Sequence, residues 1–404
     1  MKRYTPTIAI VVLLAVLAVP IWAATQDDAP PPTRDRSPVA AIAGAITTVT
    51  GIAISPLLGT GVYGAYQYFQ TPEEHRASLP WFAQVSFWLP ALALVGAVAV
   101  KDALGAALPP GWKKPLDILE TVENKATGLV AAGAVVPFTM AAMTKMITGG
   151  ELYATAPDSV VAPVGLAAGP LAAIDFSWLL NILTIPFGIA LFAVVWMASH
   201  AINVLILLSP WGAIDAALKS ARTALFGLVA VSSTIDPWLG VILSLVVVVF
   251  AYFIAGWSFR LTIFGSIFSW DYFTFRKGRF KVVPDRMKMF SGIKFPGLPQ
   301  RTYGKLTRAE DGSFRFAYRP WMVLPERVAE MPANSDLSVG RGFLFSTVTS
   351  DGDDVLVLPP RYRTHEEELA RALELANGVE PIGLLKAWSW LTGELRPKAR
   401  AQPV

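Results

Sequence analysis

The chain reads PWLGVILSLVVVVFAYFIAGWSF over residues 237–259 and RLTIFGSIFSWDYFTFRKGRFK over residues 260–281. The first stretch carries no charged residue, and it is longer than the roughly 20 residues that an α-helix needs to cross the hydrocarbon core of a membrane. The second stretch begins rich in aromatic residues and becomes basic at Arg276. This change predicts that a membrane-embedded body ends near Arg276 and that a water-facing domain follows it.

The distribution of charge supports the same division. Residues 39–275 contain 9 Lys or Arg and 12 Asp or Glu, whereas residues 276–404 contain 21 and 15. Only 16% of all residues are charged, against roughly 25% in soluble proteins. The sequence therefore predicts a multi-pass α-helical membrane domain over residues 39–275 and a C-terminal soluble β-rich (α+β) domain over residues 276–404. A large soluble α-protein with an apolar core is the alternative.

The N-terminus has the pattern of a bacterial secretory signal peptide. Lys2 and Arg3 precede the apolar run Ile8–Ile21, and Trp22-Ala23 follows it, with Ala23 at the position before a possible cleavage site. We predict a signal peptide over residues 1–24, with an uncleaved signal anchor as the alternative. Residues 25–38 contain four prolines and are expected to form a disordered linker.

The membrane domain divides into five or six apolar blocks. The first, residues 39–69, contains Pro56 and several glycines, which favour a helical hairpin or a re-entrant pair over a straight span. The aromatic segment 261–275 is too short for a further span, so an interfacial helix is expected there. The other blocks lie at residues 79–100, 127–147, 160–174, 176–208 and 237–259.

Lys and Arg in short loops predict the topology. The loop between the second and third blocks contains four lysines, and residues 276–308 contain ten Lys or Arg against one acidic residue. Because such segments stay on the cytoplasmic side, both stretches are expected there. We therefore place the chain in a bacterial inner membrane with a cytoplasmic C-terminal domain. This topology requires residues 160–174 to span, and the first block to enter and leave on one face.

The tail contains short strand-like runs separated by turns. Asp311-Gly312 and Asp351-Gly352 are strong hairpin signals. A helix is expected from Thr364, with Glu367 completing a capping box, and a second helix over residues 384–391. The strands are expected at residues 279–283, 301–306, 313–318, 321–325, 342–349 and 354–358. In outline this tail resembles a pleckstrin-homology-like barrel, although none of that family's motifs is present, and a small open β-sandwich fits equally well.

Two sets of polar residues are candidates for function. His200 and Asn203 lie three positions apart within an apolar block, and with Asp175 they form a possible transport set, while an interfacial histidine near a helix end is the structural alternative. The second set is a basic run beside the membrane, which is expected to attract anionic lipid headgroups rather than nucleic acid. This run contains Arg276, Lys277, Arg279, Lys281, Arg286 and Lys288.

Residues 39–130 resemble a family of uncharacterised bacterial inner-membrane proteins known only as a domain of unknown function. The resemblance is carried by Pro56-Leu-Leu-Gly59, Leu79-Pro80-Trp81-Phe82, Lys101-Asp102, Lys114-Pro115-Leu116-Asp117 and Thr127-Gly128-Leu129. It implies a place in the inner membrane and supplies no activity or functional residues.

The sequence contains none of the standard catalytic signatures and no cysteine, which excludes disulfides and thiolate metal sites. We therefore expect a non-enzymatic envelope protein, without cofactor or metal, whose tail binds anionic membrane lipids or an envelope protein partner. A small-molecule or ion transporter or channel is the alternative, and a membrane enzyme is the third interpretation. The sequence does not indicate an oligomeric state.

Overall fold

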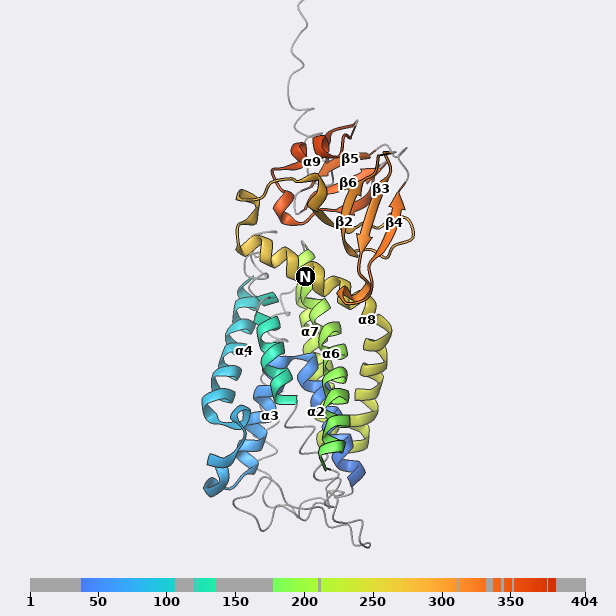
Figure 1. Ribbon diagram of the computed structural model, residues 1–404. Helices are drawn as coiled ribbons and strands as arrows, with labels where there is room; N and C mark the ends of the chain where they lie inside the picture. Colours follow the sequence, from blue (N-terminus) through green and yellow to red (C-terminus); the bar gives the residue numbers. More distant parts are fainter. Residues whose placement is uncertain are drawn as a thin grey trace, which may run out of the picture. The chain divides into compact units, whose positions relative to one another are not determined.

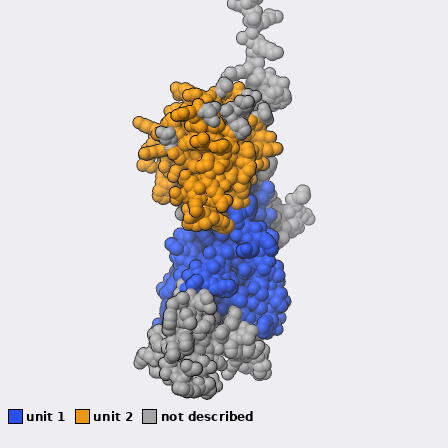
Figure 2. Space-filling model, turned by 45° about the vertical axis from the view of Figure 1, so that its right-hand side comes forward, with its two compact units in different colours: residues 1–258 blue, residues 259–404 orange. Residues whose placement is uncertain are grey.

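The computed structural model describes residues 38–105, 120–121, 123–135, 177–209, 212–310, 312–331, 337–342, 345–350, 352–375 and 377–382. The chain divides into two compact units, Met1–Ser258 and Phe259–Val404 (Figure 2). This division lies upstream of the predicted boundary at Arg276. The predicted signal peptide, almost all of the linker, the block at 160–174 and the helix at 384–391 lie outside the described residues.

Unit 1 is helical, and its helices run side by side (Figure 1). A further helical segment covers residues 123–135, and two short 3₁₀ helices, η1 (Glu73–Ser78) and η2 (Trp81–Ala83), connect α3 to α4. The helices are α2 (Pro38–Ile54), α3 (Pro56–Gln70), α4 (Val85–Gly105), α6 (Ser177–Leu208), α7 (Gly212–Ile235) and the first part of α8 (Pro237–Phe273).

Pro56 divides the first apolar block into two helices. Proline has no N–H group and fits best at the first position of a helix, where that group would have no partner; α2 ends at Ile54 and α3 begins at Pro56. Ser55 between them is extended, with φ −142°. The predicted interruption of this block is therefore confirmed.

Glycines allow very close packing around α3. A Cβ at Gly59 would lie 2.7 Å from the Cα of Ile52 in α2, and a Cβ at Gly64 would lie 2.1 Å from the carbonyl oxygen of Phe82. Both separations are shorter than van der Waals contact. Two glycines of this block, Gly59 and Gly64, thus allow close packing against neighbouring backbone.

Two helices among the described residues are long and apolar enough to cross a membrane, namely Ile185–Leu208 and Pro237–Phe273. They correspond to the fifth and sixth apolar blocks. The second of them, α8, is one helix of 37 residues. The helix predicted over 261–275 is therefore not a separate element, because no proline interrupts α8 after its first residue.

Helix α7 is not among the apolar blocks predicted from the sequence. Asp215, Lys219 and Arg222 lower its hydropathy, so it does not form an apolar block. These three residues lie four and three positions apart, which places them on one face of the helix. That spacing is a helical signal that hydropathy alone does not reveal.

Unit 2 contains one sheet of eight strands. The strands are β1 (Met287–Ser291), β2 (Tyr303–Arg308), β3 (Phe314–Tyr318), β4 (Arg327–Met331), β5 (Leu337–Arg341), β6 (Thr347–Ser350), β7 (Asp353–Val357) and β8 (Val379–Pro381). Their order is β4-β3-β2-β1-β7-β6-β5-β8. Two antiparallel meanders, β1–β4 and β5–β7, join where Phe290 pairs with Val357 and Ser291 with Leu356. β8 pairs in parallel with β5.

The sheet of unit 2 has apolar partners on both faces. Met289 belongs to a core cluster on one face of the sheet. This cluster also contains Leu369 of α9 (Glu366–Ala372) and Leu373, the residue that follows α9. Phe290, the next residue of β1, points to the opposite face. There it contacts Phe264 of α8 at a ring-centroid distance of 4.8 Å. The second half of α8 is therefore a structural part of the C-terminal domain.

Three predicted strands, 301–306, 313–318 and 354–358, overlap β2, β3 and β7, and the run 342–349 overlaps β6 in part. Gly312 and Gly352 have φ of 81° and 84° in the turns between the paired strands, as the hairpin dipeptides predict. The strands predicted at 279–283 and 321–325 are wrong. Phe280 and Trp321 instead contact Tyr362 and Phe259, so their aromatic side chains reflect packing and not strand pairing.

The capping box predicted at Thr364 is also wrong. Thr364 has a left-handed φ of 78°, and α9 begins two residues later at Glu366. His365 occupies the N-cap position without a side-chain capping bond. The helix itself is present as predicted.

The close approach at Gly64 can be tested by substitution. We expect Gly64→Ala to destabilise the protein by about 1–3 kcal/mol, because the added methyl group would overlap a backbone carbonyl that cannot rotate away. Gly96→Ala is the matched control: it lies within α4, and a Cβ there meets nothing within 4 Å. The control should be neutral or stabilising by up to about 1 kcal/mol. Equal thermal unfolding midpoints for the two variants would contradict the packing described for Gly64.

Candidate functional site

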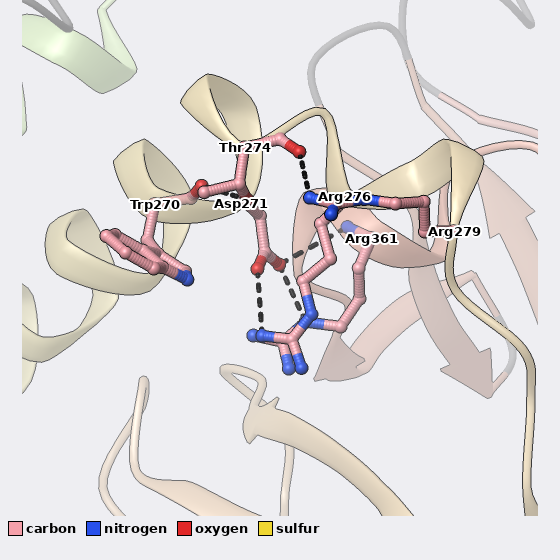
Figure 3. Close-up of polar contacts among 6 residues, drawn as sticks. All are labelled: Trp270, Asp271, Thr274, Arg276, Arg279 and Arg361. Atoms are coloured by element: carbon pink, nitrogen blue, oxygen red, sulfur yellow. Dashed lines mark hydrogen bonds and ion pairs between the residues drawn. The ribbon is translucent and has the colours of Figure 1, made fainter.

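Asp271 lies near the end of α8 with a fully buried side chain. Its Oδ2 accepts a hydrogen bond from the Nε of Arg361 at 2.6 Å and a longer one from the backbone N–H of Arg361 at 3.4 Å. Its Oδ1 lies 3.5 Å from the Nη1 of Arg276. Figure 3 shows the carboxylate of Asp271 with dashed contacts to both arginines. Because an unpaired buried charge is very unfavourable, this arrangement accounts for the position of Asp271.

The segment after α8 is fixed by local contacts. Phe275 adopts a left-handed conformation with φ 48°, which ends the helix before the 3₁₀ turn η5 (Arg276–Gly278). Arg279 donates a hydrogen bond from Nη2 to the carbonyl oxygen of Thr274 at 2.7 Å (Figure 3). Two of the six predicted lipid-binding residues, Arg276 and Arg279, thus have structural partners within the protein.

The other four predicted residues, Lys277, Lys281, Arg286 and Lys288, are exposed and form no ion pair with any described residue. Lys288 of β1 stands directly opposite Lys305 of β2. Like charges in this cross-strand position destabilise a sheet. The position of Lys288 is therefore not explained by a contribution to the stability of the sheet.

His365 connects α9 to the turn after α8. Its Nε2 lies 2.8 Å from the carbonyl oxygen of Lys277, and its Nδ1 lies 3.1 Å from Oε2 of Glu368. The contact with the Lys277 carbonyl is the main cause that raises the pKa of His365 above its ordinary 6.5, and Glu368 adds to it. Protonation therefore strengthens both contacts, and this stability is lost as the pH rises through the folded-state pKa.

A second candidate site lies within unit 1, where three helical segments bring buried polar side chains together. The segment containing residues 120 and 124, α6 and α7 each contribute residues spaced three or four positions apart. We call this group the polar cluster. It consists of Glu120, Asn124, His200, Asn203, Asp215, Lys219 and Arg222, all with low side-chain exposure.

Three contacts join the helices through the polar cluster. The Nζ of Lys219 lies 2.7 Å from Oε2 of Glu120, and both side chains are at most 13% exposed. Arg222 donates from Nη1 to Oδ1 of Asn203. The Nδ1 of His200 lies 2.9 Å from Oδ1 of Asn124. Each contact crosses between two helical segments, so the cluster fixes their register, and the pair of Lys219 with Glu120 also neutralises two of its charges.

His200 has one nitrogen unused by the protein. An amide oxygen only accepts hydrogen bonds, so Nδ1 of His200 is the donor to Asn124. In the neutral ring Nε2 then presents a lone pair, and it has no hydrogen-bond partner among the described residues. The ring is fully buried and stacks on Trp196 at 5.2 Å. A buried neutral imidazole of this kind can accept a proton or a hydrogen bond from a ligand.

The structure thus brings His200 and Asn203 into one cluster, while Asp175 lies outside the described residues. Glu120, Asn124 and the charged residues of α7 were not predicted as members of this site. The spacing of Asp215, Lys219 and Arg222 along one helix face is the signal that was available. The partners of that face come from distant parts of the chain, which no local pattern reveals.

No protein-family model, no curated protein and no solved structure matches this chain. The two resemblances noted in the sequence therefore stay predictions. Within the described ranges, no group of three or more His, Asp or Glu side chains is placed to hold a metal ion.

The ion pair of Asp271 can be tested against an exposed one. We expect Asp271→Asn to lower the free energy of unfolding of the C-terminal unit by about 3–5 kcal/mol, because Arg361 is only 7% exposed and would lose its counterion. Asp353→Asn is the control, since Asp353 pairs with Lys294 at 3.6 Å and is 61% exposed. Its loss should cost about 0–1 kcal/mol. Urea unfolding of the full chain would measure both, and similar midpoints would contradict the role given to Asp271.

Proposed function

We propose that this chain is a multi-pass integral membrane protein of a bacterial inner membrane, with a cytoplasmic C-terminal domain that binds the anionic membrane surface. The role is non-enzymatic in this proposal. The observation that carries it is the exposed apolar face of α8 together with the exposed basic residues that follow this helix, namely Lys277, Lys281, Arg286 and Lys288.

The exposed face of α8 supports membrane insertion. Ile242, Val246, Phe250 and Phe253 are 57%, 61%, 65% and 78% exposed, and they recur at three- or four-residue spacing. The small residues Gly240, Ser244, Ala251, Ala255 and Ser258 occupy buried positions of the same helix. An apolar face of this extent is unfavourable in water and suits lipid chains. Small residues on the buried face suit close helix packing in a bilayer.

Other helices of unit 1 are also apolar and expose apolar side chains, which favours additional membrane-spanning helices. Val85–Val100 and Ala43–Ile54 are apolar but shorter than the two candidate spans. Leu89, Leu94 and Leu228 expose large apolar side chains from α4 and α7. The exposed apolar surface thus extends over several helices of unit 1, which favours a multi-pass body over a single anchor. The excess of Lys and Arg after α8 favours the cytoplasmic side for the tail.

The basic residues after α8 supply the lipid-binding part of the proposal. Each exposed Lys or Arg near an anionic membrane surface contributes about 1 kcal/mol of attraction. Four such residues without internal ion pairs therefore favour anionic headgroups strongly at low salt. Arg276 is held by Asp271, so it serves to orient the segment rather than to bind lipid freely.

Lipid preference tests this proposal in the full chain. We expect membranes containing the protein to immobilise spin-labelled phosphatidylglycerol in preference to phosphatidylcholine. The triple substitution Lys277→Gln, Lys281→Gln and Lys288→Gln should reduce this preference by about 1 kcal/mol per residue. Added salt should reduce it further, because the charges are exposed.

The matched control removes three positive charges elsewhere on the same domain. Arg315, Arg327 and Arg371 are also exposed, and their substitution by Gln changes the net charge equally. This control should retain the preference for phosphatidylglycerol. If both triple variants lose it to the same degree, the effect is one of net charge and the assigned binding segment is wrong.

The polar cluster favours a second candidate function, which is transport of a proton or of a small solute. Buried ionisable residues are costly within a membrane and commonly mark the path of an ion or substrate. His200 and Asn203 are predicted to carry this function, together with Asp175 on sequence grounds. The unused Nε2 of His200 is the observation that favours it.

Proton flux tests the second function. In proteoliposomes with a pH-sensitive dye, we expect His200→Gln and Asn203→Ala to reduce flux toward that of protein-free liposomes, because the proton acceptor or its neighbour is removed. Asp175→Asn belongs to the same series. Ser233→Ala is the control, since this α7 hydroxyl only bonds to the carbonyl of Ala230. Flux that is unchanged in all three variants would exclude these residues from a transport path.

A further inference from the structure

The connection between β3 and β4 exposes four consecutive apolar side chains. Trp321, Met322 and Leu324 are 43–44% exposed, and Val323 is 83% exposed. Pro320 and Pro325 enclose them, and an ion pair between Arg319 and Glu326 closes the base of the loop at 3.7 Å. We call residues 320–325 the apolar loop. The strand predicted at 321–325 would have paired these residues within the sheet, but they form no strand.

The backbone holds the apolar loop in an unfavourable conformation. Trp321 and Met322 have φ of 54° and 61°, in the left-handed region that favours glycine. Two backbone hydrogen bonds close the loop. The N–H of Met322 donates to the carbonyl oxygen of Arg319, and the N–H of Leu324 donates to that of Pro320. Strained backbone that exposes apolar side chains is characteristic of binding loops and not of connections alone.

One contact places the apolar loop along α8. The ring of Trp321 lies 4.8 Å from the ring of Phe259, measured between centroids. Phe259 directly follows the apolar stretch 237–258, whose exposed face suits a bilayer. The Nε of Arg260, the next residue, donates to the carbonyl oxygen of Gln300 at 3.1 Å. The loop therefore meets α8 at the position where the apolar stretch gives way to the first charged residue.

We propose that the apolar loop inserts into the interfacial layer of the same membrane that α8 crosses. The inference rests on the proposed membrane location of α8 and adds a second membrane contact to the domain. Tryptophan is enriched at the level of the lipid headgroups, where its ring meets apolar chains and its N–H meets water. Four side chains are too few for a stable protein interface, which commonly needs about 800 Å² from each partner. A bilayer requires no such complementary area.

The absence of cysteine makes the test direct, since a single introduced cysteine gives one labelling site. We would place a spin label at Val323→Cys in the full chain, in nanodiscs of phosphatidylcholine alone. The expected result is a ratio of oxygen to nickel-chelate accessibility several-fold above that of Asn377→Cys, an exposed polar position in the same domain. Neutral lipid is used so that the basic residues after α8 do not determine the outcome.

A third label separates this inference from the proposed function. Val249→Cys lies on the exposed face of α8 and should report a lipid environment. If Val249 is in lipid and Val323 is as water-accessible as Asn377, the loop inference is overturned and the membrane location stands. If Val249 is itself accessible to the nickel chelate, the membrane proposal fails. If Val323 is shielded from both oxygen and nickel, a protein surface or a second copy covers the loop, and insertion into lipid is again excluded.

Discussion

Neutralisation of the buried carboxylate of Asp271 is the constraint around which the C-terminal unit is built. Arg361 reaches it from the 3₁₀ turn η8 (Pro360–Tyr362) before α9, and Arg276 reaches it from the turn after α8. The pair therefore fixes the end of α8, the basic segment and the approach to α9 relative to one another. Two aromatic contacts join further parts of the domain to α8. Phe290 of β1 packs on Phe264, and Trp321 packs on Phe259. Removal of the carboxylate would take away the acidic partner that Arg361 and Arg276 share where all three segments meet.

Much of the fold follows from local patterns. The turns at Gly312 and Gly352 and the break at Pro56 were predictable, because each depends on backbone properties of one or two residues. The join between β1 and β7 was not, since Phe290 and Val357 are brought together by the whole topology. The same reason explains the errors at Phe280 and Trp321, where aromatic residues resemble strand residues in sequence but serve contacts with distant elements.

The sequence indicated the type of each candidate site, but not all of the residues that belong to it. A run of Lys and Arg is visible in any sequence, but only the structure shows that Arg276 is bound to Asp271 whereas Lys277 and Lys281 are exposed. His200 and Asn203 were found because polar residues stand out in an apolar block. Their partners escaped notice, since Asn124 and Arg222 lie in segments of ordinary polarity and their burial depends on tertiary packing.

The pairing of β1 with β7 also has a consequence for the order of events during synthesis. The meander β1–β4 is complete once residue 331 has been made, yet the second edge of β1 has no partner until residues 353–357 follow. During that interval the backbone at Phe290 and Ser291 presents an open strand edge, which can pair with another chain. Phe264 and α8 emerge earlier and can already cover the neighbouring face of β1. Helix α8 would then shield one face of β1 before the sheet is complete.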